Sequence, residues 1–314
     1  MGYRFEFCPY RRRFKQPLQT SHGTWDVREG IILRLTNESQ TSWGEIAPLS
    51  WFGSETLEQA LDFCSQLPDE ITAETIFGIP ADLPACQFGF ESAGEEFLSK
   101  GDEHPRYSYS GLLPAGEAAL HQWQTLWKQG YRTFKWKIGV ASIQAELKIF
   151  HSLIQALPTV AKLRLDANGG LSWQEANEWL LTCDRVGIEF LEQPLPVTHE
   201  DAMLELSDRY STQLALDESV ATLNQLQASY QKGWRGVFVI KAAIAGSPSR
   251  LRQFCREHEI DAVFSSVFET TIGRTAALKL AGELSLYNRA MGFGINHWFD
   301  EDEETWLEHL WRTL

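Results

Sequence analysis

The sequence predicts an α/β protein, a modified (β/α)8 TIM barrel with an α+β capping domain. The 314 residues suffice for a barrel, which typically takes about 250 residues, and for a smaller second unit. The first hundred residues show strand-like stretches and then helical ones without alternation, which is typical of an α+β unit. From about residue 108 onward, short apolar strands alternate with helices. Each of those strands ends in a charged or hydroxyl side chain.

The capping domain is predicted to span residues 1–100. Strand-like stretches at 30–35 and 41–45 precede a helical stretch at 56–67. We expect residues 295–314 to complete this domain and residues 101–294 to form the barrel. Residues 18–25 are predicted to form a mobile capping loop, in which Gly23 provides backbone freedom.

The barrel prediction depends on the spacing of the strand ends. The expected strands are 133–138, 162–166, 188–192, 213–217, 236–241 and 261–265, with helices at 142–157 and 172–186 among the connections. Their polar ends, separated by 29, 26, 25, 24 and 24 residues, are Lys137, Asp166, Glu192, Asp217, Lys241 and Ser265. This is the repeat of successive βα units, whose strand ends meet at one mouth of a barrel.

Alternation along the strands predicts which way each side chain points. Neighbouring residues in a strand face opposite sides, so Lys135 and Lys137 lie opposite Phe134 and Trp136. The apolar side is expected to meet the outer helices and the charged side to point into the barrel. Charges buried there are costly unless they are paired or bound to a metal, which indicates a functional site.

Three of the strand-end residues are carboxylates. Asp166, Glu192 and Asp217 would repel one another unless a cation lay among them, and oxygen ligands suit a hard ion such as Mg²⁺, with Mn²⁺ as a substitute. Each carboxylate alone could be an ordinary turn or loop residue. Together, at barrel spacing, they predict a metal site.

Two lysines flank the carboxylate strands. Lys137 and Lys241 would lie on either side of a substrate held at the metal. A lysine near a divalent cation and a second ammonium has its neutral form favoured and can act as a base. Removal of a proton next to a carboxylate leaves an enediolate, whose charge a metal ion stabilises. An exposed lysine at a strand end is the alternative for Lys241 taken alone.

These motifs resemble those of the enolase superfamily, in its muconate-lactonizing subgroup. Lys135-Trp136-Lys137 is similar to its Lys-x-Lys strand, and Lys241 to its opposite lysine. The remaining matches are Leu165-Asp166-Ala167-Asn168, Glu192-Gln193-Pro194 and Asp217-Glu218-Ser219. The resemblance implies that Lys137 is the base, that Lys135 supports it, and that Asn168 and Glu218 lie behind the metal ligands.

Within the superfamily the chain resembles the o-succinylbenzoate synthase family, through Trp43-Gly44-Glu45-Ile46-Ala47-Pro48-Leu49 and Phe52-Gly53. The family dehydrates 2-succinyl-6-hydroxy-2,4-cyclohexadiene-1-carboxylate to 2-succinylbenzoate in menaquinone or phylloquinone biosynthesis. By this resemblance Lys137 removes the proton and assists departure of hydroxide, while Lys241 stabilises the enediolate.

Three further residues are candidates for substrate contacts. Ser265 and Ser266 are positioned to hydrogen-bond the succinyl carboxylate, with ordinary loop-capping serines as the alternative. Gly292 belongs to a Gly292-Phe293-Gly294 stretch that lacks the third glycine of a dinucleotide fingerprint. We expect it to close the barrel and to let backbone amides approach a carboxylate.

Two other functions remain compatible with the sequence. N-succinylamino acid racemases and dipeptide epimerases resemble this chain in carrying both lysines, because one removes a proton and the other returns it. The capping-domain motif favours the synthase. A non-catalytic barrel protein is the alternative of another class, against which the intact lysines and carboxylates argue.

Composition limits the partners and the location. A formal net charge of -14 disfavours nucleic acid and anionic membranes, so the expected partner is a small anionic carboxylate substrate; no oligomeric state follows. No apolar run approaches a membrane span of about 18 residues, and the first residues lack the apolar core of a signal peptide. Five scattered cysteines without a Cys-x-x-Cys pair are typical of reduced thiols, so we expect a cytoplasmic enzyme.

Overall fold

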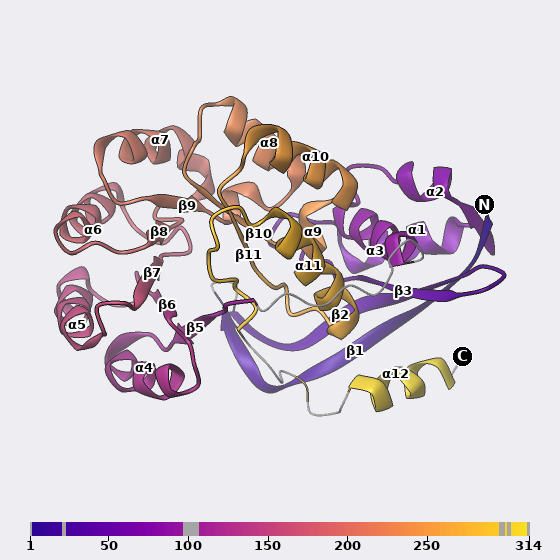
Figure 1. Ribbon diagram of the computed structural model, residues 1–314, viewed down its shortest axis with the longest axis horizontal. Coiled ribbons are helices and arrows are strands. Elements are labelled where there is room, and N and C mark those ends of the chain that lie inside the picture. Colours follow the sequence, from indigo (N-terminus) through magenta and orange to yellow (C-terminus); the bar gives the residue numbers. More distant parts are fainter. Residues whose placement is uncertain (1, 21–22, 97–106, 295–298, 300–302, 313–314) are drawn as a thin grey trace.

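The computed structural model describes residues 2–20, 23–96, 107–294, 299 and 303–312. It contains a four-stranded sheet near the N-terminus and a seven-stranded parallel sheet, in the order in which the sequence predicts them (Figure 1). The boundary predicted at residues 100 and 101 lies outside the described residues, as does the start of the 295–314 segment.

The N-terminal sheet is antiparallel with strand order β3-β2-β1-β4. Its strands are β1 (Gly2–Thr20), β2 (Gly23–Thr36), β3 (Thr41–Ile46) and β4 (Glu70–Thr72). The strands expected at 30–35 and 41–45 are confirmed as parts of β2 and β3. The long strand β1 was not predicted, because the run Arg11-Arg12-Arg13 hides its alternation: Arg12 is buried while its neighbours are exposed.

Residues 18–20 and 23–25 lie in paired strands, where the sequence predicted a loop, and residues 21 and 22 lie outside the described residues. β1 and β2 stay paired from Leu18 with Trp25 to Thr20 with Gly23. Gly23 has φ +111°, a value that favours glycine, and it lies where β2 begins. The Trp25 ring packs edge-on against Phe14 and Phe268, which holds the hairpin against the loop that follows β11 (Ala262–Phe264).

Three helices accompany this sheet, namely α1 (Leu57–Gln66), α2 (Ala73–Phe77) and α3 (Pro84–Glu96). The helix expected at 56–67 is confirmed as α1, with Thr56 and Gln59 forming a capping box at its N-terminus. Helix α3 packs against β3 at a glycine contact, where a Cβ on Gly44 would lie 2.2 Å from the Gly89 carbonyl oxygen. Glycine is therefore required at this crossing.

The seven-stranded sheet is parallel and its strands follow chain order. The other strands are β5 (Ser110–Leu113), β6 (Thr133–Lys137), β7 (Lys162–Asp166), β8 (Phe190–Glu192), β9 (Leu214–Leu216) and β10 (Val237–Ile240). The helices are α4 (Ala119–Lys128), α5 (Ile143–Ala156), α6 (Trp173–Val186), α7 (Glu200–Arg209), α8 (Leu223–Gln231), α9 (Ala242–Ala245), α10 (Pro248–His258) and α11 (Thr271–Leu284), with short 3₁₀ turns η1 (Gly116–Ala118), η2 (Val197–His199) and η3 (Glu218–Val220). Helices α4 to α8 lie on the outside of the strands (Figure 1).

The two edges of this sheet are joined by one segment. Met291 pairs with Tyr109 beside β5, and Gly292 pairs with Ser265 at the end of β11. A Cβ on Gly292 would lie 2.7 Å from the Ser265 hydroxyl oxygen, which explains the glycine. The segment thus takes the place of an eighth strand.

The inward and outward faces of the strands are as the alternation predicts. Outward residues such as Leu163, Leu214 and Phe238 belong to the main core under the helices. A separate buried cluster consists of Phe190, Ala215, Val237, Val239 and Val263. These residues alternate with the first set along the strands, which places them inside the barrel.

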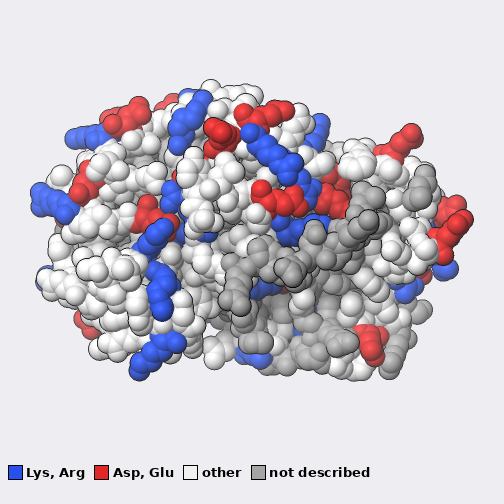
Figure 2. Space-filling view, in the orientation of Figure 1, with Lys and Arg blue, Asp and Glu red and all other residues white. Residues whose placement is uncertain are grey.

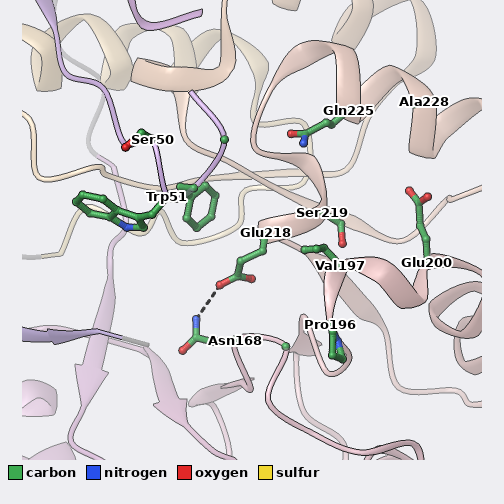
Figure 3. Close-up of a pocket in the computed structure, with 13 residues that line it drawn as sticks. Ser50, Trp51, Asn168, Pro196, Val197, Glu200, Glu218, Ser219, Gln225 and Ala228 are labelled. Atoms are coloured by element: carbon green, nitrogen blue, oxygen red, sulfur yellow. Dashed lines mark hydrogen bonds between the residues drawn. The ribbon is translucent and has the colours of Figure 1, made fainter. Parts of the chain in front are cut away.

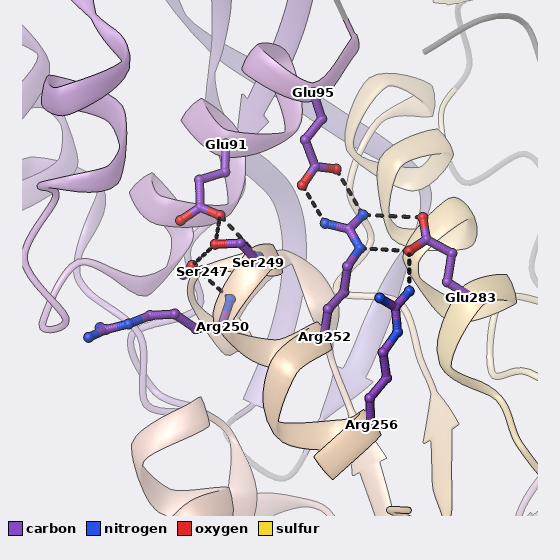
Figure 4. A network of polar contacts seen from close by, with 8 residues as sticks. All are labelled: Glu91, Glu95, Ser247, Ser249, Arg250, Arg252, Arg256 and Glu283. Atoms are coloured by element: carbon purple, nitrogen blue, oxygen red, sulfur yellow. Dashed lines mark hydrogen bonds and ion pairs between the residues drawn. The ribbon is translucent and has the colours of Figure 1, made fainter. Parts of the chain in front are cut away.

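Contacts between the N-terminal sheet and other elements are both apolar and polar. The C-terminal helix α12 (Glu303–Arg312) packs Trp306 against Tyr10 of β1. Arg252 of α10 pairs with Glu95 of α3 and with Glu283 of α11 (Figure 4). The network therefore links the N-terminal helices to the barrel helices.

Acidic and basic side chains are mingled on the face that Figure 2 shows, so the excess of acidic residues is not gathered into one patch there. Among the described residues, no helix is long and apolar enough to cross a membrane.

Candidate active site

The strand-end side chains meet at one mouth because their strands are in register. Lys137 is paired with Asp166, Asp166 with Glu192, and Glu192 with Ala215, two residues before Asp217. Asp217, Lys241 and Ser265 each follow directly after a strand end, so the strands are slightly shorter than predicted. The structure brings all six residues to the same end of the sheet.

Lys135 lies between two of the carboxylates. Its Nζ is 2.8 Å from Asp166 Oδ2 and 2.7 Å from Glu192 Oε1. Burial by itself lowers the pKa of Lys135, but the neighbouring carboxylates outweigh it and raise that pKa. Lys135 therefore carries a lasting positive charge and holds the two acids in place.

Lys137 lies one step nearer the mouth, on the same face of β6 as Lys135. Its ammonium makes no ion pair with any described residue. It is thus available to a ligand at the mouth, unlike Lys135.

Lys241 pairs with Asp217 on the opposite side of the carboxylates. Its Nζ also lies 3.9 Å from the centre of the Phe52 ring, which comes from the turn after β3. The N-terminal unit therefore contributes directly to the barrel mouth. The spacing of the strand ends gave no sign of this contact, because Phe52 belongs to the N-terminal unit and lies far from Lys241 in the chain.

The three carboxylates are buried, with Asp166 6%, Glu192 1% and Asp217 4% exposed. Burial, followed by repulsion from Asp166, raises the pKa of Glu192 well above its ordinary value. Three buried acids face only two paired lysines here, so the donor chemistry suits an additional hard cation. Within the described ranges no three acidic, histidine or cysteine side chains have their donor atoms gathered around a point. The lysine ammonium groups engage those oxygens instead.

Asn168 and Glu218 lie beside the carboxylates. The Asn168 amide nitrogen Nδ2 donates to Asp166 Oδ2 at 3.3 Å. It also donates to Glu218 Oε1 at 3.1 Å (Figure 3). Glu218 Oε2 is buried without a hydrogen-bond partner among the described residues. Burial, and then the charges of Asp217 and Asp166, raise the pKa of Glu218 to about 7.

A cavity of about 670 Å³ borders these two residues (Figure 3). The turn after β3 forms one wall through Trp51 and Phe52. The loops after β7, β8 and β9 and residues of α7 and α8 form the others. Among the described residues no lysine or arginine lines it, although its wall residue Phe52 also contacts Lys241 at the mouth.

Ser265 and Ser266 have different surroundings. Ser265 continues the inward face of Val263, and its hydroxyl makes no hydrogen bond with a described residue. The Ser266 hydroxyl donates to Glu269 at 2.9 Å and accepts from the Phe268 amide at 2.9 Å. The Gly292 amide donates to the Phe264 carbonyl at 2.7 Å. Ser265 is thus the hydroxyl that stays available at the mouth, and the Gly292 amide is already engaged.

Comparisons with known sequences cover most of the chain. Residues 10–97 match a family described as "MenC, N-terminal domain", and residues 118–309 match one described as "Enolase C-terminal domain-like". An o-succinylbenzoate synthase from Thermosynechococcus vestitus is 42% identical over 99% of this chain and 99% of its own.

The chain belongs to the o-succinylbenzoate synthase family of the enolase superfamily.

Solved structures give the same family and fold. The o-succinylbenzoate synthase from Thermosynechococcus elongatus, described as complexed with Mg in the active site, is 41% identical and superposes with a TM-score of 0.92 over 99% of this chain and 100% of that one. The L-Ala-D/L-Glu epimerase from Bacillus subtilis is 22% identical, with a TM-score of 0.78 over 95% and 91% of the two chains. The second likeness shows the shared fold alone.

Proposed function

We propose that this chain dehydrates 2-succinyl-6-hydroxy-2,4-cyclohexadiene-1-carboxylate to 2-succinylbenzoate, as expected for its family. The observation that carries the proposal is the arrangement of Lys137 and Lys241 on either side of three buried carboxylates. The product serves menaquinone or phylloquinone biosynthesis. The partner is a small carboxylate.

Asp166, Glu192 and Asp217 would hold one Mg²⁺ ion, for which Mn²⁺ can substitute. When bound, the ion supplies positive charge to the substrate carboxylate while negative charge develops on it. The three buried acids support this assignment, as does the magnesium described for the related synthase from Thermosynechococcus elongatus. We expect Asp217→Asn to weaken both Mn²⁺ binding and turnover.

The chain's own residues carry the proton. Lys137, which has no ion-pair partner among the described residues, takes the proton next to the substrate carboxylate as general base. The same proton then combines with the departing hydroxide, so that one water leaves and the ring becomes aromatic. Lys241 stabilises the enediolate from the opposite side by its charge. Lys135 orients Asp166 and Glu192 through the two contacts described above.

The remaining assignments are proposals about neighbouring residues. Asn168 and Glu218 orient the ligand Asp166, and the Ser265 hydroxyl is the better placed of the two serines for the succinyl carboxylate. Gly292 allows the close approach at the barrel closure. We also propose 1–100 with 295–314 as the capping domain and 101–294 as the barrel. Contacts of α12 with β1 support that division.

A cytoplasmic location is part of the same proposal. All five cysteines are buried free thiols, which a reducing compartment preserves.

One experiment separates the synthase from its alternatives. The purified protein is incubated with Mg²⁺ in deuterium oxide, once with the cyclohexadiene substrate and once with N-succinylamino acids. We expect rapid aromatisation of the first and little or no α-carbon exchange of the second. Fast exchange without aromatisation would assign a racemase or epimerase instead, and no metal-dependent turnover of any of them would favour a non-catalytic protein.

A further inference from the structure

Gln193 connects the loops that bear the candidate metal ligands. It follows Glu192 directly at the end of β8, and its side chain is fully buried. Its Oε1 accepts hydrogen bonds from the Asp217 amide at 3.1 Å and the Ser219 amide at 3.3 Å. Its Nε2 donates to the Leu195 carbonyl at 2.9 Å and to the Ser219 hydroxyl at 2.8 Å. Both ends of the amide are therefore satisfied, as buried polar groups require.

The backbone of Gln193 adds two further connections. Its own amide donates to the Ala215 carbonyl at 2.8 Å, and its carbonyl accepts from the Gly169 amide at 2.7 Å. Its φ of +36° lies in the left-handed region, which residues other than glycine rarely adopt. Such a conformation persists where the surrounding structure holds it in place. Asn168, on the neighbouring loop, has φ +44° as well.

These contacts meet at the three carboxylates. Asp166 lies three residues before Gly169, Glu192 directly precedes Gln193, and Asp217 offers its amide to the glutamine side chain. A change in the Gln193 amide would therefore move the backbone of Asp217 relative to Glu192. Hydrogen-bond partners behind metal ligands commonly control metal affinity in this way.

We propose that Gln193 is a positioning residue, which sets the spacing between Glu192 and Asp217 and thereby the affinity of the site for a divalent cation. The proposal rests on the metal-dependent function proposed above. The amide acts through its acceptor oxygen on Asp217 and through its donor on Leu195 and Ser219, and it does not contact the substrate.

The test measures the Mn²⁺ dissociation constant of the full-length protein by isothermal titration calorimetry and by electron paramagnetic resonance of free Mn²⁺. Gln193→Met keeps the length of the side chain and removes all four hydrogen bonds. We expect the dissociation constant to rise by about tenfold or more, the range seen when a partner behind a ligand is lost. Thermal unfolding in EDTA is recorded in parallel.

Gln87 of α3 provides a matched control. It too is buried, its Nε2 donates to the Ile79 carbonyl at 2.8 Å, and its Oε1 accepts from the Ser247 amide at 3.1 Å. Neither of these partners is one of the three carboxylates or adjacent to one in the chain. Gln87→Met should lower the melting temperature and leave the Mn²⁺ dissociation constant unchanged. This comparison separates loss of stability from loss of ligand positioning.

Gln193→Glu tests whether the hydrogen-bond pattern of the amide is what matters. It keeps an oxygen facing the Asp217 and Ser219 amides, and in the protonated form that burial favours it keeps a donor facing the Leu195 carbonyl. We therefore expect a Mn²⁺ dissociation constant within about threefold of the wild type, a smaller change than the loss of a hydrogen-bond partner behind a metal ligand causes. Where Gln193→Met is too unstable to purify, Gln193→Asn shortens the amide by one methylene and should weaken Mn²⁺ binding in the same direction.

Two results would overturn the proposal. The first is Gln193→Met, or Gln193→Asn in its place, binding Mn²⁺ as tightly as the wild type while melting earlier, which would make Gln193 a residue of structural importance only. The second is Gln193→Glu binding as weakly as Gln193→Met. Either result leaves the proposed dehydration intact as long as the wild type binds Mn²⁺ and aromatises its substrate. A wild type that does neither contradicts the proposed function itself.

Discussion

Lys135 and Lys137 lie two residues apart on β6 and have different surroundings. Lys135 is held by Asp166 and Glu192, whose charges raise its pKa. Lys137 stands at the end of the strand without an ion pair among the described residues. A lysine that must lose a proton to act as a base cannot be held by two carboxylates, because they stabilise its charged form. The structure therefore favours Lys137 over Lys135 as the base.

Replacement of the two mouth lysines should distinguish a base from a fixed charge. We expect Lys137→Ala to lower turnover by about 10²- to 10⁴-fold, the usual contribution of general-base catalysis. Lys137→Arg should be no better, because arginine stays protonated. Lys241→Ala should also be impaired, whereas Lys241→Arg should recover part of the activity because it restores the charge. Steady-state aromatisation measures all four, and near-normal turnover by Lys137→Arg would refute its role as base.

Glu218 should make the metal-free protein less stable as the pH rises. Its pKa of about 7 in the folded protein lies above the ordinary value of 4.5, mainly because of burial. The resulting stabilisation is therefore complete below about pH 4.5 and is lost as the pH passes 7. At about 1.4 kcal/mol per unit of pKa, the stability that Glu218 contributes at low pH and loses above pH 7 amounts to about 3 kcal/mol.

Urea unfolding in EDTA at pH 5 and at pH 8 measures this effect. Glu218→Gln should lose less stability between the two values than the wild type does. A smaller dependence should remain, because the raised pKa of Glu192 acts in the same direction. Equal losses in both proteins would contradict the assignment to Glu218.

At the scale of elements, the loop between β6 and α5 is held by a single carboxylate. Glu146 of α5 is buried and accepts hydrogen bonds from the amides of Gly139, Val140 and Ala141 at 2.8, 2.9 and 3.0 Å. These amides follow Lys137 along the chain, with only Ile138 between. The Glu146 carboxylate therefore fixes the point at which β6 ends.

Glu146→Ala should destabilise the protein by about 3 kcal/mol, because it leaves three amides of the loop between β6 and α5 without an acceptor. We also expect turnover to fall, since Lys137 loses its support. Ser172→Ala, which removes the exposed capping box of α6, is the control and should cost about 1 kcal/mol without affecting turnover. Chemical unfolding measures the loss of stability, and steady-state kinetics measures turnover. Full activity in Glu146→Ala would contradict the proposal that this loop supports Lys137.

At the scale of the whole molecule, one buried carboxylate joins the N-terminal sheet to the barrel. Glu45 of β3 accepts from the Tyr10 hydroxyl at 2.5 Å, from the Thr270 amide at 2.9 Å and from the Gly273 amide at 2.9 Å. Its charge lies at the N-terminus of α11, where the free amides and the helix dipole favour an anion. The sheet is thereby attached to the loop that follows Ser265.

Glu45→Gln should destabilise the protein by about 2–4 kcal/mol, because the amide offers one acceptor oxygen to several buried donors. Arg252→Met, which breaks the partly exposed network with Glu95 and Glu283 at the same junction, should cost about 1 kcal/mol or less. Denaturant-induced unfolding compares the stability of the two variants. A smaller loss of unfolding free energy in Glu45→Gln than in Arg252→Met would contradict the proposed anchoring by Glu45.

The sequence alone determined the barrel, its strand ends and the family. Strand-end spacing and alternation depend on local geometry, which repeats with every βα unit and is visible without any tertiary contact. The placement of Lys137, Asp166, Glu192, Asp217 and Lys241 at one mouth follows from that repeat. The same reasoning could not find β1, because its charged run masks a buried Arg12. It also predicted a loop where residues 18–20 and 23–25 lie in paired strands.

Tertiary structure decided the contacts between segments far apart in the chain. Phe52 reaches Lys241 and Glu45 reaches Thr270 only after the sheet and the barrel have packed together, and Gln193 reaches Asp217 only once β8 and β9 have paired within the barrel. It also distinguished the two serines as candidates for a substrate contact. The Ser266 hydroxyl donates to Glu269, whereas that of Ser265 makes no hydrogen bond with a described residue. Such contacts carry no periodic signal. They depend on the angles at which whole elements pack, and no local pattern of residues specifies those angles.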